Sequence, residues 1–412
     1  MSKIIPFRAV RPTRDKAYLL SSRPSYSYNK KHLESKLEGN PYTFLHVINP
    51  EFRENEDDTT KPNTVERFEK VKDKYDEFKS LGHFTQDESP AIYIYRQITP
   101  TDTYIGIIAG ASVDDYLNGK IKVHEHTLSQ REEMFKKYLS VCKFNAESVL
   151  LTYKDNNDVD SILDKYTDTR SEYEFTNTRE VKHDLWIVQD INDIEALQNA
   201  FLDVEHSYIA DGHHRVSSSV LYTQSQRENN YNGEEGFNYF MAFYIAESKL
   251  RIFDYNRTVS SLNDLSTEDF LTQIEKKFIL KKEGNTYLPN SLHNLSMYLE
   301  DSWYSLTIRP EFIDNNNPVG CLDAQLLSDL VLSPILGIHD LKTDNRVNFI
   351  EGTKGMEALE ESVDSNKSKV AFGLYPVSIE QLKRVADTNN VMPPKSTWIE
   401  PKIRSGLTIF EF

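Results

Sequence analysis

The sequence has only two cysteines, Cys142 and Cys321. So few thiols supply neither a disulfide framework nor a cysteine-rich zinc site. The sequence also lacks any apolar run long enough for a signal peptide or a membrane-spanning helix. We therefore expect a cytoplasmic protein without a membrane partner. The oligomeric state cannot be read from these residues.

Basic charge is also scarce, because 48 Lys and Arg residues stand against 64 Asp and Glu residues, a net charge of −16. Broad, sequence-independent binding of nucleic acid needs a basic face, so nucleic acid is an unlikely partner, although a local basic pocket is not excluded. Neither the Gly-x-Gly-x-x-Gly fingerprint nor the P-loop spacing occurs. The hydrophobic share of 38% is ordinary for a protein with a buried core.

Several side chains suited to binding phosphate or a metal ion lie together in one short stretch, Tyr208-Ile-Ala-Asp-Gly-His-His-Arg215. Apolar and small residues end a strand, Gly212 makes the turn, and helical spacing predicts a helix over 215–226. A helix N-terminus after a glycine turn favours a bound anion. His213, His214 and Arg215 add phosphate-binding groups, while Asp211 is either a metal ligand or a helix cap.

A second acidic and histidine-containing stretch is Val123-His124-Glu125-His126-Thr127-Leu128. Ser129 and Glu132 have capping-box spacing, so a helix is expected from there to about residue 141. In an extended segment His124 and His126 share one face and Glu125 the other. Three interpretations remain open: a His-x-His metal pair, Glu125 as a general base or magnesium ligand, and surface residues before a cap.

Anion capture is a further possibility in the segment 392–406. Prolines stiffen this loop, and it carries basic and hydroxyl side chains in an acidic protein. The alternative is a terminal segment anchored by Trp398. Arg8 near the N-terminus and the loop carrying Thr353 and Lys354 are weaker candidates for ligand contact. The residues predicted to clamp a substrate or phosphate are Arg8, Lys395, Ser396, Thr397 and Arg404.

The order of the expected elements predicts an α+β fold: a mixed-sheet core over 1–262 with an N-terminal extension, and a second α/β domain over 263–412 that contributes to the site. Strands are expected over 91–98, 104–109, 148–152, 184–188 and 239–246. Helices are expected over 64–81 and 194–201 and, in the second domain, over 267–278 and 292–301.

Several of these stretches together resemble the domain of unknown function 1015 family. They are Ile5-Pro-Phe-Arg-Ala-Val-Arg, Ile209-Ala-Asp-Gly-His-His-Arg, Met392-Pro-Pro-Lys-Ser-Thr-Trp with Glu400-Pro-Lys-x-Arg-Ser-Gly, and His124-Glu-x-Thr-Leu. Two positions depart from the family pattern, because Arg23-Pro-Ser-Tyr-Ser replaces a Pro-Pro-Tyr-Asp-type segment and Val216-Ser-Ser-Ser follows Arg215.

The family has no settled activity, but its Asp-Gly-His-His-Arg turn is similar to that of the ParB-like superfamily, which includes free serine kinases. The resemblance implies a ParB-like core. In it, Asp211, Gly212, His213, His214 and Arg215, with His124 and Thr127, hold ATP or ADP and Mg²⁺. Asp211 is the metal ligand, and Glu125 deprotonates a small hydroxy amino acid, most plausibly L-serine. The alternatives are a ParB-like nucleotide-binding switch and a phosphoserine phosphatase.

Overall fold

The structure is a computed structural model that describes residues 2–54, 59–228 and 231–412. Its contacts divide the chain into two compact units. The first unit comprises residues 1–122, 126–250 and 401–412, and the second comprises residues 123–125 and 251–400. The sequence-based division assigned everything after residue 262 to one C-terminal domain, whereas here the C-terminal segment belongs to the first unit.

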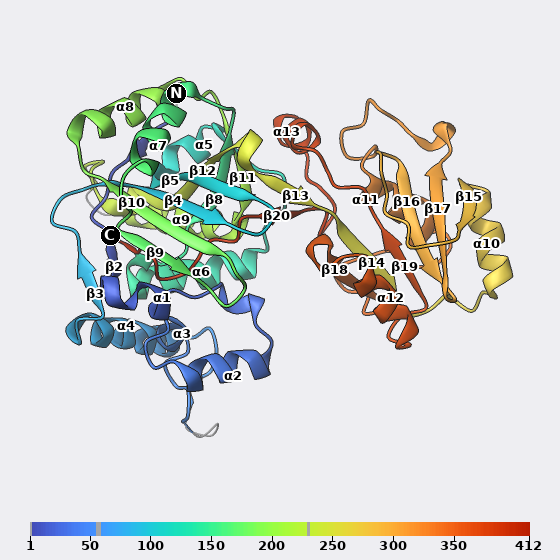
Figure 1. Ribbon diagram of the computed structural model, residues 1–412, viewed down its shortest axis with the longest axis horizontal. Coiled ribbons are helices and arrows are strands. Elements are labelled where there is room, and N and C mark those ends of the chain that lie inside the picture. Colours follow the sequence, from blue (N-terminus) through green and yellow to red (C-terminus); the bar gives the residue numbers. More distant parts are fainter. Residues whose placement is uncertain (1, 55–58, 229–230) are drawn as a thin grey trace. The chain divides into compact units, whose positions relative to one another are not determined.

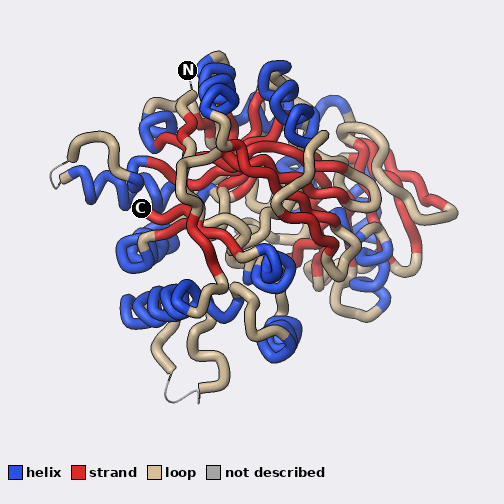
Figure 2. Tube along the Cα trace, turned by 60° about the vertical axis from the view of Figure 1, so that its left-hand side comes forward, coloured by secondary structure: helices blue, strands red, loops and turns tan. Residues whose placement is uncertain are grey.

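A large mixed sheet lies at the centre of the first unit, with helices outside it (Figures 1 and 2). Its strands are β1 (Ile4–Ile5), β4 (Ile92–Ile98), β5 (Thr103–Ser112), β6 (Ile121–Lys122), β8 (Val149–Tyr153), β9 (Tyr173–Thr176), β10 (Lys182–Val188), β11 (Ser207–Asp211) and β12 (Tyr239–Ala246). They run in the order β6-β11-β8-β12-β5-β4-β10-β9, and β1 pairs with β5. Two pairs are parallel, β6 with β11 and β8 with β12, and the others are antiparallel. This confirms the predicted α+β class.

The interior strands form because their sequences are apolar. All residues of β12 are buried, which fits a strand covered on both faces. The helices of this unit are α1 (Ala17–Leu20), α2 (Lys30–Gly39), α3 (Leu45–Ile48), α4 (Val65–Ser80), α5 (Val113–Leu117), α6 (Ser129–Cys142), α7 (Asn157–Thr167), α8 (Ile191–Leu202) and α9 (His213–Arg227). Helix α9 packs on β8 and β12 and against α6, while α7 and α8 pack together.

The helix expected over 64–81 is confirmed as α4, and its buried side chains Phe68, Val71, Tyr75 and Phe78 enter a small second core. Short strand pairs close this core. They are β2 (Val10–Pro12) with β3 (Phe84–Gln86), and β7 (Phe144–Asn145) with β21 (Phe410–Glu411). Val10 and Ile409 also exchange backbone hydrogen bonds of 2.9 and 2.8 Å. The C-terminal segment therefore completes the first unit.

The second unit is built on a sheet that is antiparallel throughout. Its strands, in spatial order, are β15 (Phe278–Glu283), β17 (Ser302–Ile308), β16 (Asn294–Leu299), β19 (Val370–Gly373), β14 (Tyr255–Val259) and β18 (Val347–Glu351). A separate pair joins β13 (Arg251–Phe253) to β20 (Trp398–Glu400). The helices are α10 (Thr267–Glu275), α11 (Asp323–Leu327), α12 (Glu357–Asp364) and α13 (Ile379–Asp387). Side chains of α10 and α11 fill one face of the sheet and those of α12 the other.

The prediction of a helix over 292–301 is wrong, because this stretch contains strand β16 (Asn294–Leu299). Leu295, Met297 and Leu299 enter the core beneath α10 and α11, whereas Tyr298 enters the core beneath α12. A two-residue period of this kind belongs to a strand with both faces covered.

Candidate functional site

The turn between β11 and α9 begins with a bulge. The pairing of β11 with β8 shifts between Ile209 and Asp211, so Asp211 lies opposite Leu150 at the end of the strand. A bulge of this kind redirects the side chain that follows it. Gly212 then adopts a φ of 104°, and α9 starts at His213 without a side-chain cap. Asp211 is therefore not the helix cap that the sequence left open as an alternative.

Arg215 folds back over this turn instead of reaching outward. Its Nη2 lies 3.0 Å from Asp211 Oδ2, and its Nη1 lies 2.8 Å from Glu147 Oε1 and 2.6 Å from the Ser148 carbonyl oxygen. The guanidinium packs so closely that a Cβ placed on Gly212 would lie 3.0 Å from it. Arg215 thus joins two carboxylates and holds the turn, a role that the sequence-based assignment to phosphate binding did not include.

Asp211 faces a second cation from the C-terminal segment, because Lys402 Nζ lies 3.7 Å from its Oδ1. Burial by itself would raise the pKa of Asp211, but Lys402 and Arg215 together hold it below its ordinary value. A third of the Asp211 side chain remains exposed. Asp211 is therefore an ionised carboxylate within reach of solvent.

Glu147 is the site residue that sequence reasoning missed. It comes just before β8, and β8 runs antiparallel to β11, so the start of one strand meets the end of the other. Burial raises the pKa of Glu147, although Arg215 opposes the shift. Ser405 also donates a 3.2 Å hydrogen bond to Glu147 Oε2. No motif marks this glutamate, and only the strand pairing brings it to Asp211.

The two histidines of the turn differ in environment. His213 is buried, whereas His214 is half-buried at the start of α9. Burial lowers the pKa of His214, and the charge of Arg131 lowers it further, which favours the neutral imidazole. The buried Nδ1 of His214 has no hydrogen-bond partner within residues 2–54, 59–228 and 231–412. Such an atom is normally satisfied, so a ligand or water is the expected partner.

The segment around Glu125 differs from the expectation. It contains no strand; His124 is buried, and both Glu125 and His126 are exposed, so the two imidazoles do not share one environment. Residues 123–125 belong to the second unit, where the His124 carbonyl accepts a 2.8 Å bond from the Met392 amide. Glu125 lies near enough to Tyr255 to contribute to the raised pKa of that phenol, which is mainly due to burial.

The expected capping box at the start of α6 is also absent, since Leu128 is the N-cap and no side chain caps the helix. Thr127 instead donates its hydroxyl hydrogen to Glu132. Thr127 is therefore engaged with a neighbouring carboxylate in this structure. Its predicted contact with a nucleotide stays a prediction.

The predicted clamp residues fall into different places. In the second unit, exposed Lys395 has a left-handed φ of 59° and its Nζ lies 5.4 Å from the Tyr255 ring centre. Ser396 is buried and donates to the Pro393 carbonyl at 2.8 Å, so it supports the loop. Thr397 lies in the same loop, half-buried. In the first unit, Arg404 donates to Ser21.

Two weaker candidates are engaged with protein groups. Arg8 is exposed and donates to the Asp87 carbonyl at 2.9 Å. Lys354 pairs with Glu351 at 3.0 Å, and Thr353 is exposed beside it. Neither observation points to a ligand at these positions.

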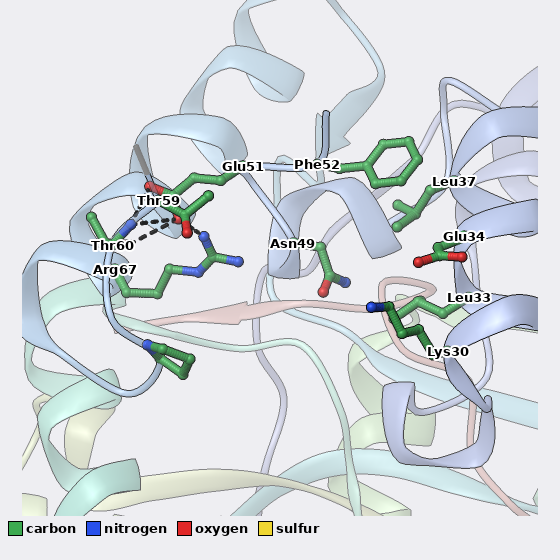
Figure 3. A pocket seen from close by; sticks show the side chains of 11 residues that line it. Lys30, Leu33, Glu34, Leu37, Asn49, Glu51, Phe52, Thr59, Thr60 and Arg67 are labelled. Carbon is green, nitrogen blue, oxygen red and sulfur yellow. Dashed lines mark hydrogen bonds and ion pairs between the residues drawn. The ribbon is translucent and has the colours of Figure 1, made fainter. Parts of the chain in front are cut away.

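A cavity of about 300 Å³ lies away from the Asp211 turn, between α2 and the chain from Asn49 to Arg67 (Figure 3). On one side Glu51 accepts hydrogen bonds from the Thr60 amide and hydroxyl and pairs with Arg67. These contacts join residues on either side of positions 55–58, which lie outside the described residues. The cavity has mixed polar and apolar walls without a dominant chemistry.

The donor set at the turn bears on the predicted magnesium ion. Mg²⁺ in proteins is commonly held by one or two carboxylates together with substrate phosphates. Asp211 provides one such carboxylate, and its Oδ1 faces Lys402 only at the longer distance of 3.7 Å. No cluster of three or more His, Cys, Asp or Glu side chains suited to a metal occurs in the part of the chain that the structure describes. Asp211 would therefore supply at most one protein ligand to such an ion, and the remaining ligands would come from water or from a bound molecule.

A family profile described as "Protein of unknown function (DUF1015)" matches residues 4–325. The chain belongs to this family. The predicted family membership is thereby confirmed, and the match includes the β11–α9 turn but ends before the loop at residue 392. A search among curated proteins found no match. No helix in the described ranges combines the length and apolarity needed to cross a membrane.

Solved structures similar to this chain include C-terminally truncated SbnI from Staphylococcus aureus, with 12% identity, coverage of 71% of this chain and 82% of that chain, and a TM-score of 0.36. A mutant of a free serine kinase in complex with AMP shows 10% identity, coverage of 75% and 94%, and a TM-score of 0.36. A conserved hypothetical protein from Pyrococcus furiosus shows 9% identity, coverage of 75% and 98%, and a TM-score of 0.34.

Proposed function

We propose that this protein transfers a phosphoryl group between an adenine nucleotide and free L-serine, with O-phosphoserine as the phosphorylated amino acid. In the forward direction the serine hydroxyl oxygen bonds to phosphorus, the bond from phosphorus to the nucleotide leaving group breaks, and a protein carboxylate accepts the hydroxyl proton. The choice of nucleotide and serine follows the resemblance of the Asp-Gly-His-His-Arg turn to that of free serine kinases.

The observation that supports this reaction best is the state of Asp211. It is ionised, partly exposed, and fixed by Arg215 and Lys402 at the start of α9. Asp211 would hold Mg²⁺ together with nucleotide phosphate oxygens, and the ion would neutralise charge on the transferred group. Lys402 and the first turn of α9 place further positive charge beside the same point. The lowered pKa of His214 keeps its imidazole neutral, so this side chain adds no charge to the site.

Two glutamates compete for the role of proton acceptor. Glu125 is the prediction from sequence, and its place in the reaction stays a prediction. Glu147 shares a guanidinium with Asp211 and has a raised pKa, which brings a carboxylate nearer to the range in which it accepts protons near neutral pH. Comparing Glu125→Gln with Glu147→Gln in one assay separates the two, because loss of the base costs about 10²–10⁴-fold in rate.

The test is to incubate the full chain with L-serine, Mg²⁺ and ATP or ADP, and in reverse with O-phosphoserine and ADP or AMP, following ³¹P NMR. Phosphoserine formation that is abolished in Asp211→Asn but kept in the exposed control Asp158→Asn supports the proposal. No turnover in either direction, or full activity in Asp211→Asn, contradicts it. Phosphate release from phosphoserine without nucleotide would instead identify a phosphatase, and nucleotide binding without turnover a switch.

A further inference from the structure

Ser405 is held firmly beside Glu147 by the backbone of the C-terminal segment. Its amide donates to the Ser22 carbonyl at 2.8 Å, and its own carbonyl accepts from the Ser22 amide at 3.1 Å. The next amide, that of Gly406, donates at 2.9 Å to the carbonyl of Ala146, the residue directly before Glu147. The Ser405 side chain is buried. The backbone on both sides of this hydroxyl is therefore fixed, and one of the bonds fixes it to the chain that carries Glu147.

The Ser405 hydroxyl and the Arg215 guanidinium hold different oxygens of the same carboxylate. Ser405 Oγ donates to Glu147 Oε2 at 3.2 Å, and Arg215 Nη1 lies 2.8 Å from Oε1. Among the described residues, the Ser405 hydroxyl bonds to Glu147 alone. One donor on each oxygen fixes the plane of the carboxylate and leaves lone pairs for a proton. The Glu147 side chain is 24% exposed, so a bound molecule can reach it from solvent.

The two partners differ in how they respond when Glu147 takes up a proton. An arginine only donates hydrogen bonds and keeps its charge, so its attraction to the carboxyl group weakens once the negative charge is gone. A serine hydroxyl donates to an ionised carboxylate and can turn to accept from a protonated one. Ser405 is therefore the partner that can stay bonded to Glu147 in both protonation states.

Several charged groups compete for influence on Glu147. The titratable and charged groups that face it are Arg215 from α9, Asp211 from β11, Lys402 from the C-terminal segment and Tyr138 from α6. Burial raises the pKa of Glu147, whereas Arg215, the hydrogen bond from Ser405 and Lys402 oppose this rise. Ser405 is the only uncharged group among these opposing influences, so its effect is separable from that of the cations.

We propose that Ser405 is the positioning residue of Glu147, which holds the carboxylate in one orientation before and after it accepts the proton of the substrate hydroxyl. The uptake of that proton rests on the proposed function, whereas the orientation of Glu147 does not. In the rival role Ser405 is purely structural and only ties the C-terminal segment to the chain before β8. The two roles differ in whether removal of the hydroxyl changes the titration of Glu147.

The experiment follows the Glu147 carboxyl by ¹³C NMR titration of the full chain and measures kcat and kcat/KM against pH. Because a hydrogen bond to the ionised form is lost, Ser405→Ala should raise the pKa of Glu147 and move the acidic decrease of kcat/KM to higher pH. Above this decrease kcat should fall about tenfold, the factor that a hydrogen bond to a charged group is worth. The control Thr152→Val removes a buried hydroxyl of β8 that donates to the Ile245 carbonyl, and should leave both profiles unchanged.

A third variant keeps the test valid if Ser405→Ala does not fold. Ser405→Cys has nearly the same shape and a weaker donor, so the pKa of Glu147 should lie between those of the wild type and Ser405→Ala. An unchanged Glu147 titration in both Ser405 variants overturns the proposal, and so does an equal shift in Thr152→Val. A shifted titration with an unchanged kcat/KM profile also overturns it. A shifted titration without any serine turnover contradicts the proposed function and leaves the orienting contact in place.

Discussion

Lys402 Nζ lies 3.7 Å from Asp211 Oδ1, although the two residues come from distant parts of the sequence. Lys402 precedes the closing strand of the first unit, and Asp211 ends a strand of its central sheet. The approach of the ammonium group offsets the cost of burying the carboxylate, since the pKa of Asp211 lies below its ordinary value despite its surroundings. The C-terminal segment thus contributes, together with Arg215, to keeping Asp211 ionised.

Replacing Lys402 with Gln is expected to raise the pKa of Asp211, because the nearby positive charge is removed while burial remains. Ionised Asp211 is then lost earlier on acidification, so the affinity for a magnesium nucleotide should fall more at pH 5 than at pH 8. Lys402→Arg keeps the charge and should keep the affinity. Carboxyl ¹³C NMR titration measures the pKa directly, and an unshifted Asp211 resonance in Lys402→Gln would contradict the assignment.

The decrease of kcat/KM at acidic pH should reflect the protonation of Glu147. Its pKa lies above the ordinary glutamate value, so on acidification it gains a proton before Asp211, whose pKa lies below the ordinary aspartate value. If Glu147 accepts the serine proton, kcat/KM falls as the pH drops through this raised pKa. Glu147→Gln should then lose about 10²-fold or more in rate, whereas the exposed control Glu195→Gln retains it. An unchanged profile in Glu147→Gln would leave Glu125 as the base.

Gly212→Ala is expected to destabilise the protein and to disturb the site together. The left-handed backbone costs an L-residue about 1–2 kcal/mol, and the new Cβ would press on the Arg215 guanidinium. Gly82→Ala is the matched control, since Gly82 has a φ of 69° but nothing within 4 Å of the added Cβ. Denaturant unfolding should show a larger loss for Gly212→Ala, and equal losses would mean that the Arg215 contact is unimportant.

His183 should make the protein less stable in acid. It is buried between the Tyr95 hydroxyl at 2.8 Å and the Asn177 amide at 2.9 Å, and burial lowers its pKa to about 3. Between pH 6.5 and this value the unfolded chain binds a proton that the folded chain does not. As the pH decreases through this range, the free energy of unfolding should therefore fall by about 1.4 kcal/mol per pH unit because of this residue. His183→Gln should flatten the slope, whereas exposed His32→Gln should leave it unchanged.

The local elements near the site could be predicted because their signals are short in range. Apolar spacing and the glycine turn identify β11 and α9, and the apolar run identifies β12. The stretch over 292–301 was misread as a helix because its apolar side chains enter two cores, which hides the alternation of a strand. Periodicity alone does not separate a short strand buried on both faces from a buried helix.

The sequence by itself determined the family, the mixture of helices and strands, and the turn in which Asp211, Gly212 and Arg215 stand together. The tertiary structure decided which other side chains contact that turn. The antiparallel pairing of β8 with β11 brings Glu147 to Arg215, and the return of the C-terminal segment brings Lys402 to Asp211. The first contact depends on the register of two paired strands, and the second depends on the path by which the C-terminal segment returns to the first unit. Both features bring together residues that are distant in sequence, and no local pattern of residues encodes them.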